Sequence, residues 1–231
     1  MTDKKLNVFD TPVKHGSVVN MVVNRIKEAL INQDLKPGDY LPTENVLMQK
    51  LGVSKTSIRE AIKMLQALGV LEMKRGQGTR IRTSSNGDMI DPLIFQLILQ
   101  DSQPPDVMEL RMMYESAYTI LAMKNATSED LDVIKTTHNH FKILVLKGEQ
   151  TVEDDLNFHL SILKATHNPF VIRIGETIYN LFKRSMEVPL KSRPQIALDN
   201  HTQILKAFCE KDAVKLQSAV DQSFEHWKTG L

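Results

Sequence analysis

The sequence predicts a mainly α-helical protein in two parts: three helices with a β-hairpin, followed by an all-helical bundle of seven helices. Apolar residues recur every three or four positions through most of the chain, which is typical of helices. One stretch, VLEMKRGQGTRIR, alternates apolar and polar residues about a glycine-rich turn instead, which predicts a hairpin. The polar run TSSNGD, residues 83–88, is typical of a linker and separates residues 1–82 from residues 89–231.

The composition excludes several classes of protein. With 42% hydrophobic and 25% charged residues, the 231-residue chain is neither disordered nor fibrous. No apolar run reaches the roughly 18–20 residues that cross a membrane, and MTDKKLNVFD lacks the apolar core of a signal peptide. We therefore expect a cytoplasmic protein with no membrane partner. The single cysteine, Cys209, excludes an intrachain disulfide and is expected to be a small buried residue.

The charge is unevenly distributed along the chain. Residues 1–83 hold 14 Lys+Arg against 8 Asp+Glu, whereas residues 84–231 hold 15 against 20. The basic N-terminal part therefore predicts a polyanionic partner.

Helix signals in the N-terminal part follow one another closely. Residues 18–33 have helical spacing; Thr43 can cap a second helix that ends at Gly52, and Ser54 can cap a third that ends at Gly69. Two helices joined by a tight turn are typical of a helix-turn-helix, in which the first braces the second across a DNA groove.

The third helix carries polar residues suited to DNA. Lys55, Thr56 and Arg59 lie opposite the apolar Ile58 and Ile62, near the positive N-terminal end of the helix. Phosphates and base edges are most easily reached from there.

The hairpin that follows resembles a wing, because Arg75, Arg80 and Arg82 lie near its tip and second strand. A solvated basic surface is the alternative, since Lys and Arg are exposed in most proteins. The order of the elements within about 65 residues favours a DNA-binding winged helix.

Residues 18–82 resemble the winged helix-turn-helix of the GntR transcription regulators. The similarity is carried by LKPGDYLP before the second helix, SKTSIREAIKML in the third and RGQGTRI in the wing. In the FadR branch of that family, the start of the third helix and the wing tip contact DNA. The resemblance places these roles on Ser54, Lys55, Thr56, Ser57, Arg59, Arg75 and Gly76. Asn45 stands where many members have an arginine.

Helix signals also organise the C-terminal part. They are Asp91-Pro92, Pro105, Thr127 with Asp130, Thr151, Asn168-Pro169, Arg193-Pro194 and Asp212, and they predict seven helices. No strand signal interrupts them, which indicates a helical bundle.

Asp155 and His159 stand four residues apart and must project from one side of their helix. The pair by itself is compatible with a simple hydrogen bond or with exposure at the helix edge. His201 and His226 lie on helices further along, and a carboxylate with imidazoles is a ligand set for a divalent metal.

DDLNFH, THNP and NHTQILKAF resemble the FCD ligand-binding domain of FadR-type regulators. The resemblance implies a divalent metal (Zn, Ni or Mn) held by Asp155, His159 and His201, beside a pocket for a small carboxylate. The usual fourth ligand falls on Ser223, and His226 follows three residues later. Arg111 matches a position near the effector; an ion pair with Glu115 is the alternative for it. His138, His140 and His167 are expected at the surface or edge.

The sequence therefore predicts a dimeric, ligand-responsive repressor of a catabolic operon that binds a palindromic DNA operator. One alternative is an acyl-CoA sensor without metal. Another is a metal-dependent enzyme; against it, no glutamate stands beside the ligands in the sequence, and a DNA-binding head has no enzymatic purpose.

Overall fold

The computed structural model describes residues 17–83, 97, 99, 104–183 and 187–228. The chain divides into two compact units between Pro92 and Leu93. The predicted linker 83–88, apart from Thr83, lies outside the described residues. So does the predicted helix DPLIFQLILQ, apart from Leu97 and Leu99.

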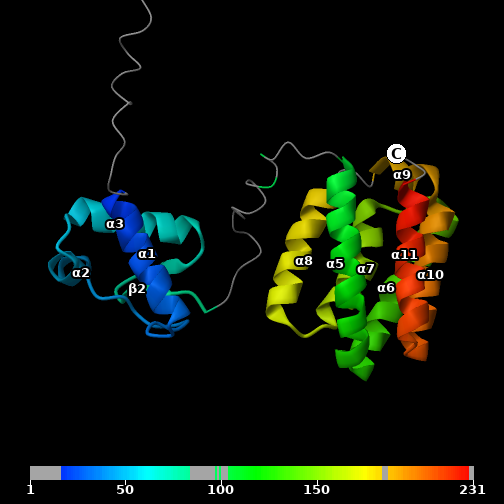
Figure 1. Ribbon diagram of the computed structural model, residues 1–231, viewed down its shortest axis with the longest axis horizontal. Helices are drawn as coiled ribbons and strands as arrows, with labels where there is room; N and C mark the ends of the chain where they lie inside the picture. The colour runs from blue at the N-terminus through cyan, green and yellow to red at the C-terminus, as the bar shows by residue number, and fades with distance from the viewer. Residues whose placement is uncertain (1–16, 84–96, 98, 100–103, 184–186, 229–231) are drawn as a thin grey trace, which may run out of the picture. The chain divides into compact units, whose positions relative to one another are not determined.

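The N-terminal unit has three helices and a two-stranded antiparallel sheet (Figure 1). They are α1 (Val18–Ile31), α2 (Glu44–Leu51), α3 (Lys55–Ala67), β1 (Leu71–Lys74) and β2 (Gly78–Ile81). The Thr43 side chain accepts a hydrogen bond from the backbone at the start of α2, and Ser54 does the same for α3. Gly52 takes the left-handed conformation, with φ of 65°, that ends α2. These predicted helix boundaries are confirmed.

The core of this unit joins α3 to α1 and to the hairpin. Its buried residues are Val22, Ile26, Leu41, Ile58, Ala61, Ile62, Leu65, Leu71 and Ile81. In the hairpin Leu71 pairs with Ile81 and Lys74 with Gly78, which leaves Arg75, Gly76 and Gln77 in the turn. Gly76 has φ of 77°, a conformation that residues with a side chain rarely adopt. The wing is therefore braced at its base by the buried Leu71 and Ile81, and Gln77 in its turn accepts a hydrogen bond from the Tyr40 hydroxyl.

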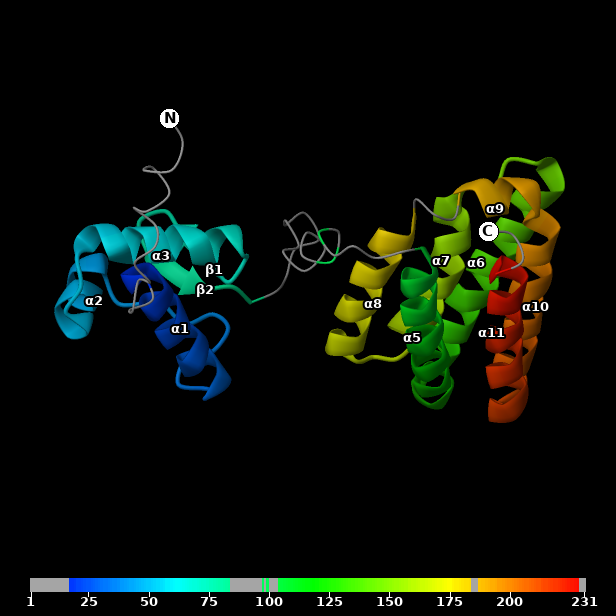
Figure 2. The same ribbon diagram turned by 45° about the horizontal axis from the view of Figure 1, so that its top comes forward.

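The C-terminal unit is a helical bundle (Figures 1 and 2). Its described residues form α5 (Pro104–Asn125), α6 (Ser128–Lys147), α7 (Val152–Lys164), α8 (Pro169–Phe182), α9 (Glu187–Ser192), α10 (Pro194–Glu210) and α11 (Ala213–Lys228). The short α9 was not predicted, because EVPLKS has too few residues to show a helical repeat. The mainly helical fold class is confirmed.

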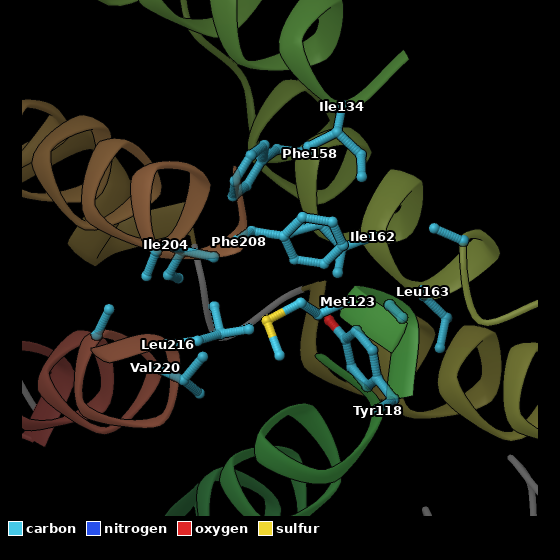
Figure 3. Close-up of a cluster of buried hydrophobic side chains, with 14 of the residues drawn as sticks. Tyr118, Met123, Ile134, Phe158, Ile162, Leu163, Ile204, Phe208, Leu216 and Val220 are labelled. Atoms are coloured by element: carbon cyan, nitrogen blue, oxygen red, sulfur yellow. The ribbon is translucent and has the colours of Figure 1, made fainter. Parts of the chain in front are cut away.

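Side chains from α5, α6, α7, α8, α10 and α11 form the core of the bundle, and Figure 3 shows part of it. They include Tyr118 and Met123 of α5, Ile134 of α6, Phe158 and Ile162 of α7, Ile204 and Phe208 of α10, and Leu216 and Val220 of α11. The helix α7 packs against α5, α6 and α8, so most of its circumference is covered. Of its polar residues, Asp155, His159 and Ser161 are buried in the bundle, whereas Glu153, Asn157 and Lys164 are exposed.

Local signals set where α7 begins. Thr151 and Asp154 form a capping box, in which each side chain accepts a hydrogen bond from the backbone of the other. Thr127 and Asp130 do the same for α6. Both predicted starts are confirmed.

The structure corrects the expectation for Cys209, which is exposed. Its neighbours on α10, Ala207 and Phe208, take the inward-facing positions instead. In the described part of the chain, no helix is both long and apolar enough to cross a membrane.

Replacing Gly175 by alanine is expected to destabilise the C-terminal unit by about 1–3 kcal/mol, as overpacking does. An added Cβ would lie 2.5 Å from Leu163 Cδ2 and 3.1 Å from Tyr114 Cε1, and Leu163 is fully buried. Urea denaturation measures the change. Asn180→Ala, at an exposed position of the same helix, is the control and should have little effect. A Gly175→Ala protein as stable as the wild type would contradict this packing.

A candidate metal centre and a candidate DNA interface

The helix α7 carries Asp155 and His159 into the interior of the bundle. They are 1% and 4% exposed, because the apolar Phe158 and Ile162 beside them bury the same side of the helix. His201, on α10, is 2% exposed and meets them there. The predicted convergence of these three residues is what the structure shows.

The donor atoms of the three residues have the spacing of metal ligands. His201 Nε2 lies 3.2 Å from Asp155 Oδ1 and 3.1 Å from His159 Nε2. His159 Nε2 lies 3.8 Å from Asp155 Oδ2. Two atoms bound to one ion at about 2.0–2.2 Å are about 3.0–3.5 Å apart at octahedral or tetrahedral angles. Two of the three separations lie in this range and the third is slightly longer, so the three groups can hold one divalent ion.

Hydrogen bonds within the cluster leave some of its polar atoms unsatisfied. Among the described atoms, Asp155 Oδ2 and His201 Nδ1 are buried and have no hydrogen-bond partner. The Nε2 atoms of His159 and His201 face each other, and only one of them can donate a proton to the hydrogen bond between them. An unsatisfied buried carboxylate oxygen destabilises a fold, so Asp155 Oδ2 favours an additional group such as a cation in the cluster.

A second carboxylate supports His159 from behind. Glu115 Oε1, on α5, lies 2.6 Å from His159 Nδ1, and Glu115 is 2% exposed. A carboxylate at this nitrogen orients the ring so that Nε2 faces the centre of the cluster. The sequence interpretation missed this role. The available signal was Arg111 and Glu115, two polar residues four apart on one helix.

Arg111 forms the ion pair with Glu115 that was the alternative reading of its role. Its Nε donates to Glu115 Oε2 over 3.1 Å, and both side chains are buried. The guanidinium lies over the Phe182 ring at 4.5 Å and near the Tyr179 ring at 5.4 Å. Contact of Arg111 with an effector stays a prediction.

The charges of the cluster follow from these contacts. Burial alone raises the pKa of Glu115, but His159 and Arg111 outweigh it and bring this pKa to about 2. Burial also raises the pKa of Asp155, and His201 and His159 reverse that effect, so its pKa is lowered. Burial lowers the pKa of His201 to about 4, which leaves this imidazole neutral at pH 7. At neutral pH the two carboxylates are ionised, and so weak a base as Glu115 is unsuited to general-base catalysis.

Two tyrosines extend the network away from the metal ligands. The Tyr179 hydroxyl donates to Glu115 Oε2 over 3.3 Å and is hydrogen-bonded to the Tyr118 hydroxyl. Burial raises the pKa of both phenols well above the ordinary value. They remain neutral and act as hydrogen-bonding groups.

The fourth metal position of the resemblance stays open to test. Ser223 is buried, and its hydroxyl donates to the Val220 carbonyl over 2.7 Å. The side chain of His226 lies outside the described residues.

The remaining histidines correct one expectation. His138 is buried, with Nε2 3.0 Å from Thr202 Oγ1, so its expected place at the surface or edge was wrong. The helix α6 turns this residue toward α10. His140 and His167 are exposed and lie beside Asp154 and Asp130.

On the N-terminal unit, the predicted DNA-binding residues of α3 share one exposed face. Lys55, Thr56 and Arg59 are exposed, whereas Ile58 and Ile62 are buried. Arg59 also forms an ion pair with Glu44 at the start of α2. Ser54 and Ser57 hydrogen-bond each other at the start of α3.

At the wing, Arg75 and Gly76 are exposed at the tip. Arg80 Nε donates a hydrogen bond to Glu72 Oε1 across the hairpin, and this bond raises the pKa of Arg80. The cationic character of the tip therefore rests on Arg75.

A helix-turn-helix with a wing, followed by a helical bundle with a buried polar cluster, defines a DNA-binding transcription regulator with a sensing domain. The chain belongs to the gntR family of bacterial regulatory proteins, whose model matches residues 18–81. The model of the FCD domain matches residues 106–226, which fits the FadR subfamily. Both parts of the resemblance are confirmed.

Relatives agree with this family. The Uxu operon regulator of Haemophilus influenzae is 29% identical over 228 residues, covering 93% of this chain and 84% of that protein. The HTH-type transcriptional regulator LutR of Bacillus subtilis is 26% identical over 196 residues, covering 82% and 90%. The galactonate operon transcriptional repressor of Escherichia coli is 26% identical over 206 residues, covering 86% and 90%.

Among solved structures, a Streptococcus agalactiae GntR protein superposes with a TM-score of 0.66 and 25% identity, covering 92% of this chain and 100% of that one. These matches are to transcription regulators, and the chain is a regulator rather than an enzyme.

In metal-free protein, lowering the pH from 7 to 5 is expected to reduce the free energy of unfolding of the C-terminal unit by about 2 kcal/mol. The pKa of His201 is about 4 in the folded state against 6.5 ordinarily, so only the unfolded state gains a proton in this range. Stability is complete above pH 6.5 and falls toward pH 4.

Urea denaturation in EDTA, followed by the single tryptophan Trp227, measures this change. A His201→Gln variant should lose less stability between the two pH values. Equal loss in the variant and the wild type would contradict the assignment to His201.

Proposed function

We propose that the protein is a dimeric repressor of a catabolic operon. Its affinity for a palindromic operator is controlled by a small carboxylate, a hydroxy acid or a sugar acid, bound at a metal held by Asp155, His159 and His201. The observation that carries this proposal is the convergence of these three buried side chains on a space that fits one ion.

The charge of the cluster supports both the cation and the effector. Asp155 and Glu115 contribute two negative charges and Arg111 one positive charge, so the buried carboxylates outnumber the guanidinium. A divalent ion adds two positive charges beside them, which favours one carboxylate effector close by. When bound, the metal offers open coordination positions to carboxylate and hydroxyl oxygens. Further positions can be filled by water, the effector or His226.

Two nitrogens and one oxygen suit Zn, Ni or Mn. Arg111 lies behind Glu115, where its guanidinium can add to the attraction of a carboxylate. A relative of this chain is named a galactonate operon repressor, and galactonate is a sugar acid. These points support the sugar-acid or hydroxy-acid class.

The DNA interface that we propose consists of the residues which the resemblance named. They are Ser54, Lys55, Thr56, Ser57, Arg59, Arg75 and Gly76. One winged helix covers a short DNA segment, so two copies on a palindrome are required for selectivity. Exposed apolar residues on the adjoining α5 and α8, namely Met113, Phe170 and Ile174, supply a surface for pairing two copies.

Purified protein is expected to contain about one divalent metal ion per chain, and Asp155→Ala should abolish it, because a three-ligand site loses its anionic ligand. Mass spectrometry for Zn, Ni and Mn after gel filtration measures the content. His140→Ala is the matched control, since this exposed histidine lies outside the cluster. Metal that survives Asp155→Ala would contradict the site. A wild type that takes up no metal would support the acyl-CoA class of sensor or an empty site.

Lys55→Ala and Arg59→Ala are each expected to weaken operator binding about 5- to 100-fold at fixed salt, since each removes a contact to a phosphate or a base. Band-shift titration on a duplex selected from a random library measures affinity. The shifted complex should contain two chains.

Lys27→Ala is the control: it removes the same charge from an exposed position on α1. Binding that does not depend on salt, or that survives both substitutions, would refute the DNA interface.

A further inference from the structure

An ion pair links the two helices of the helix-turn-helix. Arg59 Nε donates to Glu44 Oε2 over 2.8 Å, although the two residues are 15 positions apart. Glu44 is the first residue of α2, and Arg59 lies on the exposed face of α3. Their side chains are 33% and 57% exposed. A negative charge therefore lies beside a cation of the proposed DNA interface.

The stability of the fold does not explain this pair. Solvent-exposed ion pairs contribute little to folding, because water screens them and the side chains lose freedom. The position of α3 is already set by the Ser54 cap and by the buried Ile58. The effect of Glu44 must therefore be sought in DNA binding, where its charge repels phosphates.

The geometry of the pair leaves Arg59 able to read a base. A guanidinium has five N–H donors, and the bond from Nε uses one of them. The two terminal nitrogens remain, and a pair of N–H groups matches the two acceptors of a guanine edge in the major groove. An unrestrained arginine is flexible and reaches the nearest phosphate, whatever the sequence.

Glu44 is itself well placed to hold the arginine. It occupies the first turn of α2, where the helix dipole favours a carboxylate. Among the described residues, Lys55, on the same face of α3, forms no ion pair, so it stays free for phosphate. On this face, Arg59 is thus paired with a carboxylate and Lys55 is not.

We propose that Glu44 is a specificity-determining residue of the DNA-binding unit. It positions the guanidinium of Arg59 for a base edge and keeps that guanidinium from phosphates of any sequence. This inference rests on the proposed place of Arg59 in the DNA interface. Glu44 acts through Arg59 and is a positioning residue.

The test compares two duplexes of equal length with the full-length protein: the tightest binder that the wild type selects from a random library, and an unselected random sequence. Glu44→Gln keeps the size of the side chain and removes its charge. Affinity for the random duplex should rise about 3- to 10-fold, and the slope of log affinity against log salt should steepen by about 1, as one added phosphate contact does. The ratio of selected to random affinity should fall by a similar factor.

Two controls isolate the mechanism. Glu28→Gln removes the same charge from an exposed pair with Arg25 on α1, at 3.9 Å, and should leave the slope unchanged. In an Arg59→Ala background, Glu44→Gln should have no further effect, because its partner is gone. An unchanged ratio in Glu44→Gln, an equal effect of Glu28→Gln, or an effect that persists without Arg59 would each overturn the inference.

Failure of the proposed function gives a different result. If the wild type prefers no duplex over random sequence and its binding ignores salt, the DNA interface itself is wrong. If the wild type selects a sequence and Arg59→Ala alters that selection while Glu44→Gln does not, only the role of Glu44 is wrong. Circular dichroism of each variant confirms that α2 and α3 are folded.

Discussion

The central constraint in the C-terminal unit is the burial of two ionised carboxylates, Asp155 and Glu115, inside an apolar bundle. Buried charges destabilise a protein unless they are paired. Arg111 and His159 pair with Glu115, and His201 approaches Asp155, but Asp155 Oδ2 has no hydrogen bond within the described part of the chain. The polar groups around the cluster accommodate the two buried carboxylates. The unsatisfied oxygen of Asp155 makes the space between the three groups suited to a cation.

The N-terminal unit has an excess of positive charge. Its surplus of basic residues attracts DNA, but acidic residues hold two of the arginines: Glu44 holds Arg59, and Glu72 holds Arg80. A helix surface with only free cations would bind any DNA, since phosphates are present in every sequence. Local acidic partners restrict where the guanidinium groups can point. The net positive charge therefore attracts DNA, and the ion pairs orient the guanidinium groups.

Family comparison and geometry answer different questions about this chain. The matches to the gntR and FCD models establish a transcription regulator. They do not identify the fourth metal ligand. At that position this chain has Ser223, whose hydroxyl donates to a carbonyl of its own helix. The carboxylate of Glu115 behind His159 comes from geometry alone. The contact between Glu115 and His159, which lies outside the family motifs, thus explains how the ring of this proposed ligand is oriented.

The sequence by itself determined the helix boundaries, because caps such as Thr151 and Ser54 act through neighbouring backbone groups. It also placed Asp155 and His159 on one side of a helix, since that follows from helical spacing. It could not place Glu115 against His159, 44 positions along the chain, nor turn His138 inward and leave Cys209 exposed. Those features depend on how α5, α6, α7 and α10 pack, and packing is a property of the whole bundle: only the tertiary structure decides which helix face meets which.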